Sequence, residues 1–383
     1  MDFALTEEQQ AVFEMARGFG AERIAPHALD WEDAGTIPRA LLREAGALGL
    51  GGVYVDPEFG GSGLNRLDAA LIFEALAMAC PSVAAFLSIH NMCAGMIDAY
   101  GDAAMKTKRL PSLCALETVC SYCLTEPGSG SDAAALRTRA DRDEEGWRLT
   151  GTKAFISGGD FSDLYIVMSR TGGDGPRGIS ALLVEAGAPG LSFGAQERKM
   201  GWKAQPTAQL QFDACRVPAD NLLGEEGEGF AYAMAGLDGG RLNIAACSLG
   251  AAQTALDKAL AYAGERRAFG QTLDQFQGLQ FKLAEMETLL QAARVFLRQA
   301  AWSLARGAPD ATKRCAMAKL FVTDIAFDVA NDALQIHGGY GYLRDYGLEK
   351  IVRDLRVHQI LEGANEIMKV IISRALLSER DRR

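Results

Sequence analysis

The sequence has few histidines, no surplus of basic residues and no long uncharged apolar run. Its four histidines lack the paired spacing of a zinc site, and its eight cysteines are scattered. The net charge of −10 argues against a nucleic-acid partner, because phosphate binding needs a basic face. No stretch of 18 uncharged apolar residues occurs, so no membrane span is predicted.

The amino terminus also lacks the features of a targeting segment. It contains no basic segment followed by a long apolar one, and we therefore expect a cytoplasmic protein. Thr6 followed by Gln9 instead predicts a capping box at the start of a helix.

The first two thirds of the chain divide into a helical part and a β part. In residues 1–118, apolar residues recur at helical spacing in Ala11–Phe19, Ile37–Leu48 and Leu67–Met78. Residues 119–227 contain short apolar runs between Gly, Asp and Pro clusters, which is the pattern of an antiparallel β domain. The lone CxxC of this part has no thioredoxin-like surroundings, so we interpret its cysteines as buried strand residues.

The last part, residues 228–383, is helical again. Ile244–Gly264, Phe276–Ala305 and Ala311–Ile336 are long periodic segments that predict a helical bundle with faces available for oligomerisation. The predicted fold class is therefore α+β, mainly α, with three domains: helical, β and helical.

The first candidate motif is the glycine-rich segment Tyr122–Asp132. Gly128 and Gly130 allow backbone to approach a ligand closely, and the neighbouring hydroxyls offer compact hydrogen bonds. Its match to the dinucleotide pattern GxGxxA is rejected, because Pro127 precedes it and no helical crossover follows. A bland glycine-rich turn and a ligand loop explain this segment equally well.

A second motif, Lys153–Gly159, places Phe155 and Ser157 two residues apart. On a regular strand both would share one face, which suits a flat ring that needs one polar contact. The alternative is a half-buried strand that runs into a turn.

A third motif, Gln335–Tyr342, has three glycines at the end of a long predicted helix. One glycine would serve as a C-cap, whereas three suggest backbone amides exposed to an anion. His337 by itself is interpreted as a packing or hydrogen-bonding residue.

The fourth motif, His358–Glu366, contains a carboxylate within an apolar run. Such a position should raise the pKa of Glu362 and suit it to general-base work, although a solvent-facing loop carboxylate is the alternative. Asn365 is a candidate cap for the final helix, and Glu366 would stabilise its first turn.

Taken together, these motifs resemble the acyl-CoA dehydrogenase family over nearly the whole chain. Cys123–Asp132 is similar to the family's flavin loop, and Gln335–Tyr342, followed by Asp345, Lys350 and Asp354, resembles its C-terminal signature. The resemblance implies an N-terminal helical domain, a central β domain and a C-terminal four-helix bundle, assembled as a homotetramer.

The resemblance also implies an activity, the FAD-dependent oxidation of an acyl-CoA to its α,β-enoyl form. Glu362 would remove the α-proton, while hydride passes from the β-carbon to flavin N5. Some relatives carry the base at the position of Gly240, which cannot serve here. Electron-transfer flavoprotein is the implied electron acceptor.

Residue by residue, the resemblance assigns three groups of contacts. Those to the flavin ring are Tyr122, Cys123, Leu124, Thr125, Gly130, Ser131, Phe155, Ile156 and Ser157. The remaining FAD contacts, part of them supplied by a neighbouring subunit, are Arg266, Phe269, Phe276, Gln277, Gln335, Ile336, His337, Gly338, Gly339, Ala364, Asn365 and Glu366. Those to the substrate are Ser131, Asp238, Gly239, Gly240, Arg241, Gly363 and Arg374.

Two departures and one branch-level likeness refine this expectation. Many members have Trp where Phe155 stands and Thr where Ala364 stands, so a hydroxyl contact is lost at the second position. Lys153–Gly158, Asn243–Ala252 and the segment from His358 onward resemble the branch that acts on isobutyryl-CoA. The alternatives are a short straight-chain acyl-CoA dehydrogenase, a flavin monooxygenase of the same fold and a non-catalytic CoA-binding scaffold.

Overall fold

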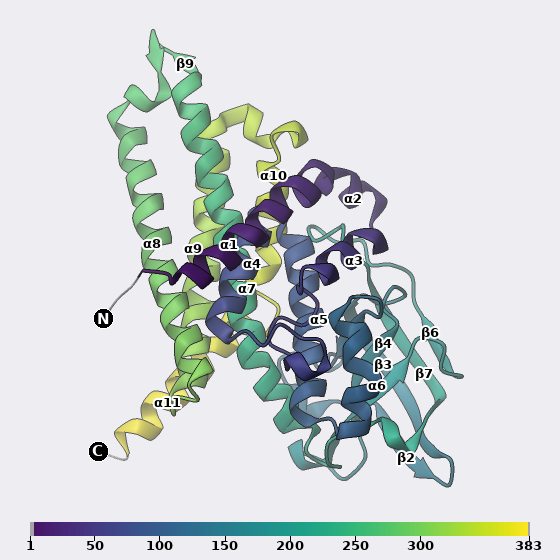
Figure 1. Cartoon of the computed structure of the whole chain (residues 1–383). Helices are drawn as coiled ribbons and strands as arrows, with labels where there is room; N and C mark the ends of the chain where they lie inside the picture. Colours follow the sequence, from purple (N-terminus) through teal and green to yellow (C-terminus); the bar gives the residue numbers. More distant parts are fainter. Residues whose placement is uncertain (1–3, 382–383) are drawn as a thin grey trace.

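Residues 4–381 are described by the computed structural model, in which helices from both ends of the chain pack together beside a central sheet (Figure 1). The first part is helical, as predicted, and α1 begins with the expected capping box, in which Gln9 N donates to Thr6 Oγ1 at 3.2 Å. Its helices are α1 (Glu7–Phe19), α2 (Ala28–Ala34), α3 (Arg39–Ala47), α4 (Arg66–Ala77), α5 (Pro81–Tyr100) and α6 (Ala103–Cys114).

The middle part forms one mixed sheet with the order β6-β7-β3-β2-β4-β5-β8, and β1 lies beside β4. Its strands are β1 (Cys120–Cys123), β2 (Arg139–Asp143), β3 (Gly146–Ser157), β4 (Leu164–Arg170), β5 (Ile179–Glu185), β6 (Leu191–Phe193), β7 (Thr207–Val217) and β8 (Leu222–Leu223). Most pairs are antiparallel, as predicted, but β1 and β2 both run parallel to β4.

The parallel pairs arise because β1 and β2 follow one another along the same edge of β4. β1 pairs with Leu164–Val167, whereas β2 meets β4 only at Arg170. Between them, over residues 124–138, the chain leaves the sheet and returns in the same direction, and this excursion contains most of the glycine-rich segment Tyr122–Asp132. No helical crossover follows β1, which supports the rejection of a dinucleotide motif. Cys120 and Cys123 are buried free thiols on β1. The other six cysteines are also buried and free.

The last part is a bundle of long helices that ends in α11, at lower left in Figure 1 on the side of the bundle away from the sheet. Its elements are α7 (Gly229–Glu265), a hairpin of β9 (Arg267–Ala268) and β10 (Gln271–Thr272), α8 (Gln277–Ala305), α9 (Ala311–His337), α10 (Leu348–His358) and α11 (Asn365–Arg380). The predicted α+β, mainly α, fold is confirmed. None of the described helices is long and apolar enough to cross a membrane.

Helix α7 is longer than predicted, because it continues through two glycines that break the apolar pattern. Gly239 and Gly240 are buried within it, and packing against neighbouring helices outweighs their poor helix propensity. Gly250 serves the same packing, because a side chain there would collide with the Glu74 carbonyl oxygen of α4. One continuous core therefore joins the N-terminal helices to α7, α8, α9 and α10.

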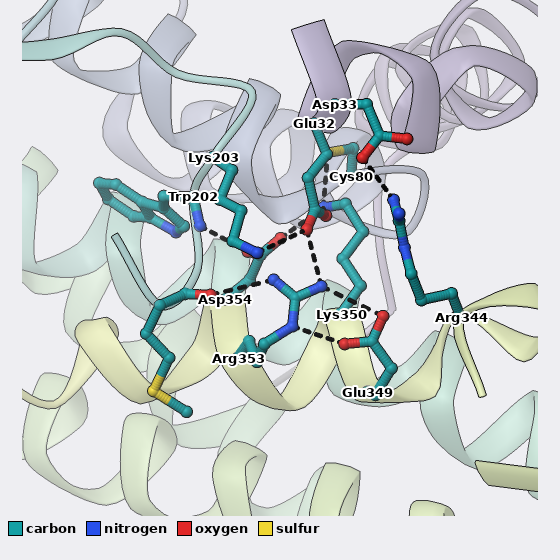
Figure 2. Close-up of polar contacts among 11 residues, drawn as sticks. Glu32, Asp33, Cys80, Trp202, Lys203, Arg344, Glu349, Lys350, Arg353 and Asp354 are labelled. Carbon is teal, nitrogen blue, oxygen red and sulfur yellow. Dashed lines mark hydrogen bonds and ion pairs between the residues drawn. The ribbon is translucent and has the colours of Figure 1, made fainter. Parts of the chain in front are cut away.

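A cluster of buried charges fastens the three parts of the chain together (Figure 2). Glu32 of α2, with 2% of its side chain exposed, pairs with Arg353 of α10 at 2.7 Å. One residue further along α10, Asp354 pairs with Lys350 at 2.5 Å and accepts the backbone N–H of Trp202 at 2.6 Å. Trp202 belongs to the loop before β7, so α10 is bonded to both other parts.

We predict that Glu32→Gln lowers the free energy of unfolding by about 2 kcal/mol, because Arg353 loses a buried charge-assisted contact, although its ion pair with Glu349 remains. The control is Asp33→Asn, whose exposed pair with Arg344 retains 64% and 52% side-chain exposure and contributes at most about 1 kcal/mol. Urea denaturation of both variants measures the difference. Equal losses in the two variants would contradict a fastening role for Glu32.

Candidate active site

The predicted base, Glu362, lies in the turn between α10 and α11. Its φ of 55° is left-handed, a conformation that L side chains adopt at a cost. The turn brings its carboxylate onto α7 at Gly240, where an added Cβ would stand 2.6 Å from Oε2 and 3.0 Å from Cδ. Only a residue without a side chain fits at position 240 while Glu362 occupies this place.

Glu362 is half-buried, and one of its two carboxylate oxygens is shielded from solvent. Its Oε2 atom is buried and accepts no hydrogen bond in the described structure. Burial raises the pKa of Glu362 to about 7, against the opposing effect of the positive charges of Arg241 and Lys319. The apolar run of the sequence predicted this direction of shift.

Lys319 of α9 holds the turn in place through hydrogen bonds. Its fully buried ammonium donates to the Gly363 carbonyl at 2.9 Å and to Asn365 Oδ1 at 2.7 Å, and Asn365 Nδ2 donates to Asp324 at 2.7 Å. The prediction of Asn365 as a helix cap is wrong, because the buried amide is engaged by α9 instead. Ala364 holds the N-cap position of α11 and offers no side-chain bond.

Glu366 lies in the first turn of α11, as predicted. Gly363, which directly follows Glu362, has a φ of 88°, and a Cβ there would stand 2.6 Å from the Met368 methyl carbon. Glycine is therefore required immediately after the base.

The predicted substrate contacts on α7 form a buried pair. Arg241 donates to Asp238 at 2.6 Å, and Thr312 donates to the second Asp238 oxygen at 2.5 Å. Arg241 Nε also donates to the Glu362 carbonyl at 3.3 Å. The structure thus brings Asp238, Gly240, Arg241 and Gly363 together around the base.

Two other substrate-side predictions lie on exposed surfaces. Ser131 is exposed in the loop after β1, and Arg374 is exposed on α11. Arg374 lies nine residues beyond Asn365, which is roughly 14 Å of helix. The described residues do not join these two side chains to the cluster around Glu362.

Tyr122, on β1, is a β-domain residue that lies near Glu362. Its hydroxyl is buried without a hydrogen-bond partner in the described structure. Burial raises the pKa of Tyr122, and the nearby charge of Glu362 raises it further. Two unpartnered polar groups, one from the β domain and one from the helical domain, therefore lie close enough to interact electrostatically.

The loop after β1 is held by a buried ion pair that the sequence did not reveal. Lys153 of β3, fully buried, donates to Glu126 at 2.7 Å and to the Leu124 carbonyl at 2.9 Å. Glu126 also accepts the backbone N–H groups of Arg137 and Thr138 at 2.7 and 2.8 Å. Glu126 lies inside the first motif and Lys153 is the first residue of the second. Opposite charges in these two motifs are the one sequence signal that could have predicted the ion pair.

The expected alternation around Phe155 is wrong, because a bulge interrupts β3. The register with β7 shifts between Lys153 and Ile156, and Phe155 has a φ of 58° with 67% exposure. Ser157 Oγ instead accepts a hydrogen bond from Gln205 at 2.5 Å. The bulge turns an apolar ring outward beside the open loop, where a Cβ at Gly128 or Gly130 would touch nothing within 4 Å.

The remaining predicted flavin-ring residues lie along the same edge with different exposure. Cys123 and Ile156 have their side chains in the sheet core, so only their backbone can meet a ligand, and Leu124 is 9% exposed. The Thr125 carbonyl accepts Ala154 N–H at 2.9 Å and ties the loop to β3. This edge combines an outward aromatic ring, open backbone and small hydroxyls, and it fits a flat ring with polar edges.

Most of the second group of predicted FAD contacts gathers at the far end of the bundle, whereas Ala364, Asn365 and Glu366 lie beside Glu362 at the start of α11. A hollow of about 390 Å³ is lined by Arg266, Ile336, His337, Gly338 and Gly339, among others. His337 stacks on Tyr262 at 4.2 Å and bonds to the Ala333 carbonyl, as expected of a packing residue.

The neighbouring predicted contacts frame the same end. Phe269 at the tip of the β9–β10 hairpin is 96% exposed, and its ring lies 6.3 Å from that of Phe276, next to Gln277 at the start of α8. Gln335 lies on the last turn of α9. This end of the bundle and the loop after β1 are at opposite ends of the molecule (Figure 1).

Known proteins share both the sequence and the fold of this chain. Residues 6–117, 121–215 and 227–377 match the N-terminal, middle and C-terminal domains of acyl-CoA dehydrogenase. The chain is 52% identical to the mitochondrial isobutyryl-CoA dehydrogenase of Bos taurus, covering 98% of this chain and 90% of that protein. Its identity to the same enzyme of Dictyostelium discoideum is 54%, covering 97% and 90%.

Solved structures agree. Butyryl-CoA dehydrogenase from Megasphaera elsdenii superposes with a TM-score of 0.95 at 39% identity, covering 98% of this chain and all of that one. A structure described as the FAD complex of PigA superposes with a TM-score of 0.94 at 30% identity, covering 98% and 99%. The chain belongs to the acyl-CoA dehydrogenase family, whose cofactor is FAD.

Proposed function

We propose that this acyl-CoA dehydrogenase oxidises a short 2-methyl-branched acyl-CoA, isobutyryl-CoA first, and that Glu362 is its base. One observation carries the assignment of the base. The Glu362 carboxylate lies against Gly240 with its Oε2 atom buried and without a hydrogen-bond partner in the described structure, and its pKa is raised to about 7.

The chemistry requires such a carboxylate, because the α-proton of a thioester is very weakly acidic. A general base acts best when its pKa lies near the working pH and when it is not occupied by another donor. FAD, when bound, supplies the hydride acceptor. The backbone N–H of Glu362 is the proposed donor to the thioester oxygen, where negative charge develops as the proton leaves.

The flavin ring is proposed to lie against the loop from Tyr122 to Ser131 and the bulge Phe155–Ser157. The outward ring of Phe155 and the open glycines support this placement. The hollow around Arg266 lies toward the end of the bundle that carries β9, whereas β2 of the sheet lies at the other end of the molecule (Figure 1). We therefore propose that it meets the FAD of a neighbouring subunit in a homotetramer, and that electron-transfer flavoprotein accepts the electrons.

We predict that Glu362→Gln loses turnover by at least about 10²–10⁴-fold while retaining FAD and substrate binding, because the amide keeps the shape and loses the basicity. In the wild type, kcat/KM should fall about tenfold per pH unit below pH 7, since the raised pKa keeps the carboxyl protonated there. Steady-state rates with an artificial electron acceptor measure both. Near-wild-type turnover of the variant would exclude Glu362 as the base.

A second prediction concerns Arg266. Arg266→Ala should weaken FAD retention by about 1.5–3 kcal/mol, because a charge-assisted bond to the pyrophosphate is lost. Arg267→Ala is the matched control, since Arg267 is exposed on the hairpin and bonds to the Gly270 carbonyl. Flavin content after size-exclusion chromatography measures the effect, and a monomeric species with stoichiometric FAD would contradict the shared site.

The substrate assignment predicts an order of kcat/KM across a panel of acyl-CoAs. Isobutyryl-CoA should be best, with butyryl- and 2-methylbutyryl-CoA still active, because hydrophobic pockets discriminate one methylene by only about 1–3 kcal/mol. Octanoyl-CoA should fail on steric grounds. If octanoyl- or isovaleryl-CoA came out best, the branch assignment would be wrong, while the family would stand.

A further inference from the structure

The base turn, residues 358–365 between α10 and α11, begins at a histidine with two hydrogen-bond partners from different parts of the chain. His358, the last residue of α10, is fully buried. The Trp202 indole N–H donates to His358 Nε2 at 3.0 Å, and His358 Nδ1 lies 2.7 Å from Ser248 Oγ on α7. Sequence reasoning missed this triad, because Trp202 and His358 are 156 positions apart.

The partners fix the protonation state of the imidazole. An indole nitrogen only donates, so His358 Nε2 must accept and Nδ1 must carry the proton. The Nδ1–H then donates to Ser248 Oγ, whose own proton goes to the Ile244 carbonyl at 2.8 Å. Burial lowers the pKa of His358 to about 3, so the neutral ring persists at ordinary pH.

Trp202 is anchored to α10 twice, one helical turn apart. Its backbone N–H donates to Asp354 at 2.6 Å, and its ring meets the His358 ring edge-on with centroids 5.2 Å apart. The approach is close, because a Cβ at the preceding Gly201 would collide with the Arg353 carbonyl oxygen. Figure 2 shows Trp202 beside Asp354 in this contact.

The base turn therefore contacts α7 both at its start and at Glu362. His358 is bonded to Ser248, and Glu362, four residues later, lies on Gly240. Ser248 and Gly240 are eight residues apart, roughly 12 Å along the helix. A shift of α10 relative to the β domain would therefore move the carboxylate along α7.

We propose that Trp202, His358 and Ser248 are positioning residues that fix Glu362 relative to the β domain on which the flavin ring lies. The inference rests on the proposed function of Glu362. Dehydrogenation needs the base and the hydride acceptor on opposite sides of the substrate at one separation, yet they belong to different domains. The Trp202–His358 bond joins those domains four residues from the base, and a displacement of about 1 Å can cost about 10²-fold in rate.

The test is Trp202→Phe, which keeps one aromatic ring and removes the N–H donor together with the pyrrole ring. Trp147→Phe is the matched control, because Trp147 is an equally buried β-domain tryptophan whose indole nitrogen has no hydrogen-bond partner in the described structure. We expect kcat to fall about 10- to 100-fold in Trp202→Phe, with KM nearly unchanged, and to stay near wild type in the control.

Amide hydrogen exchange supplies a readout that does not depend on turnover. Residues 359–365 should exchange faster in Trp202→Phe than in the wild type or in Trp147→Phe. His358→Gln, whose amide oxygen can still accept from Trp202, should recover part of the kcat that His358→Leu loses. If Trp202→Phe does not fold, Ser248→Ala removes the other partner of His358 and should give the same pattern more weakly.

The outcomes separate this inference from the proposed function. Equal kcat and equal exchange in the two tryptophan variants, together with an inactive Glu362→Gln, would overturn the positioning role alone. An active Glu362→Gln would overturn the proposed base and this inference with it.

Discussion

The structure depends on holding a half-buried carboxylate, one oxygen of which is shielded from water, without a hydrogen-bond partner in the described structure. An isolated buried charge is strongly unfavourable, and the protein meets this cost by raising the pKa of Glu362 to about 7 rather than by neutralising it with an ion pair. Arg241 and Lys319 lie near enough to limit the shift, yet their hydrogen bonds go to backbone carbonyls and side-chain oxygens elsewhere. The carboxylate is stabilised enough to ionise and remains free to take a proton.

Such a group needs rigid surroundings, and three sets of polar contacts supply them. Lys319 of α9 bonds to the turn and to Asn365 of α11, Arg241 bonds to the turn from α7, and His358 ties its start to the β domain. All are buried, so each would be costly if left unsatisfied. The cluster around Glu32 extends this fastening to the N-terminal helices and makes α10 the element on which all three parts converge.

Sequence reasoning succeeded where the signal is local. The capping box at Thr6, the ends of α8 and α9, and the direction of the Glu362 pKa shift all follow from neighbouring residues. It failed where distant segments decide the outcome. The start of α7, the bulge at Phe155 and the engagement of Asn365 by α9 each depend on packing partners far along the chain. The roles of the individual site residues remain predictions.

The burial of all eight thiols has a consequence for oxidative wear. A reduced flavin that meets oxygen generates peroxide, and peroxide attacks cysteine as the exposed thiolate. Here burial raises the pKa of Cys93, Cys123 and Cys247, so the thiols nearest the enclosed core stay protonated as well as covered. Oxidation would instead fall first on sulfur that solvent can reach, such as Met200 with 58% exposure, next to the Trp202 loop. Oxidative damage to the protein would therefore appear as methionine sulfoxide rather than as a loss of free thiols.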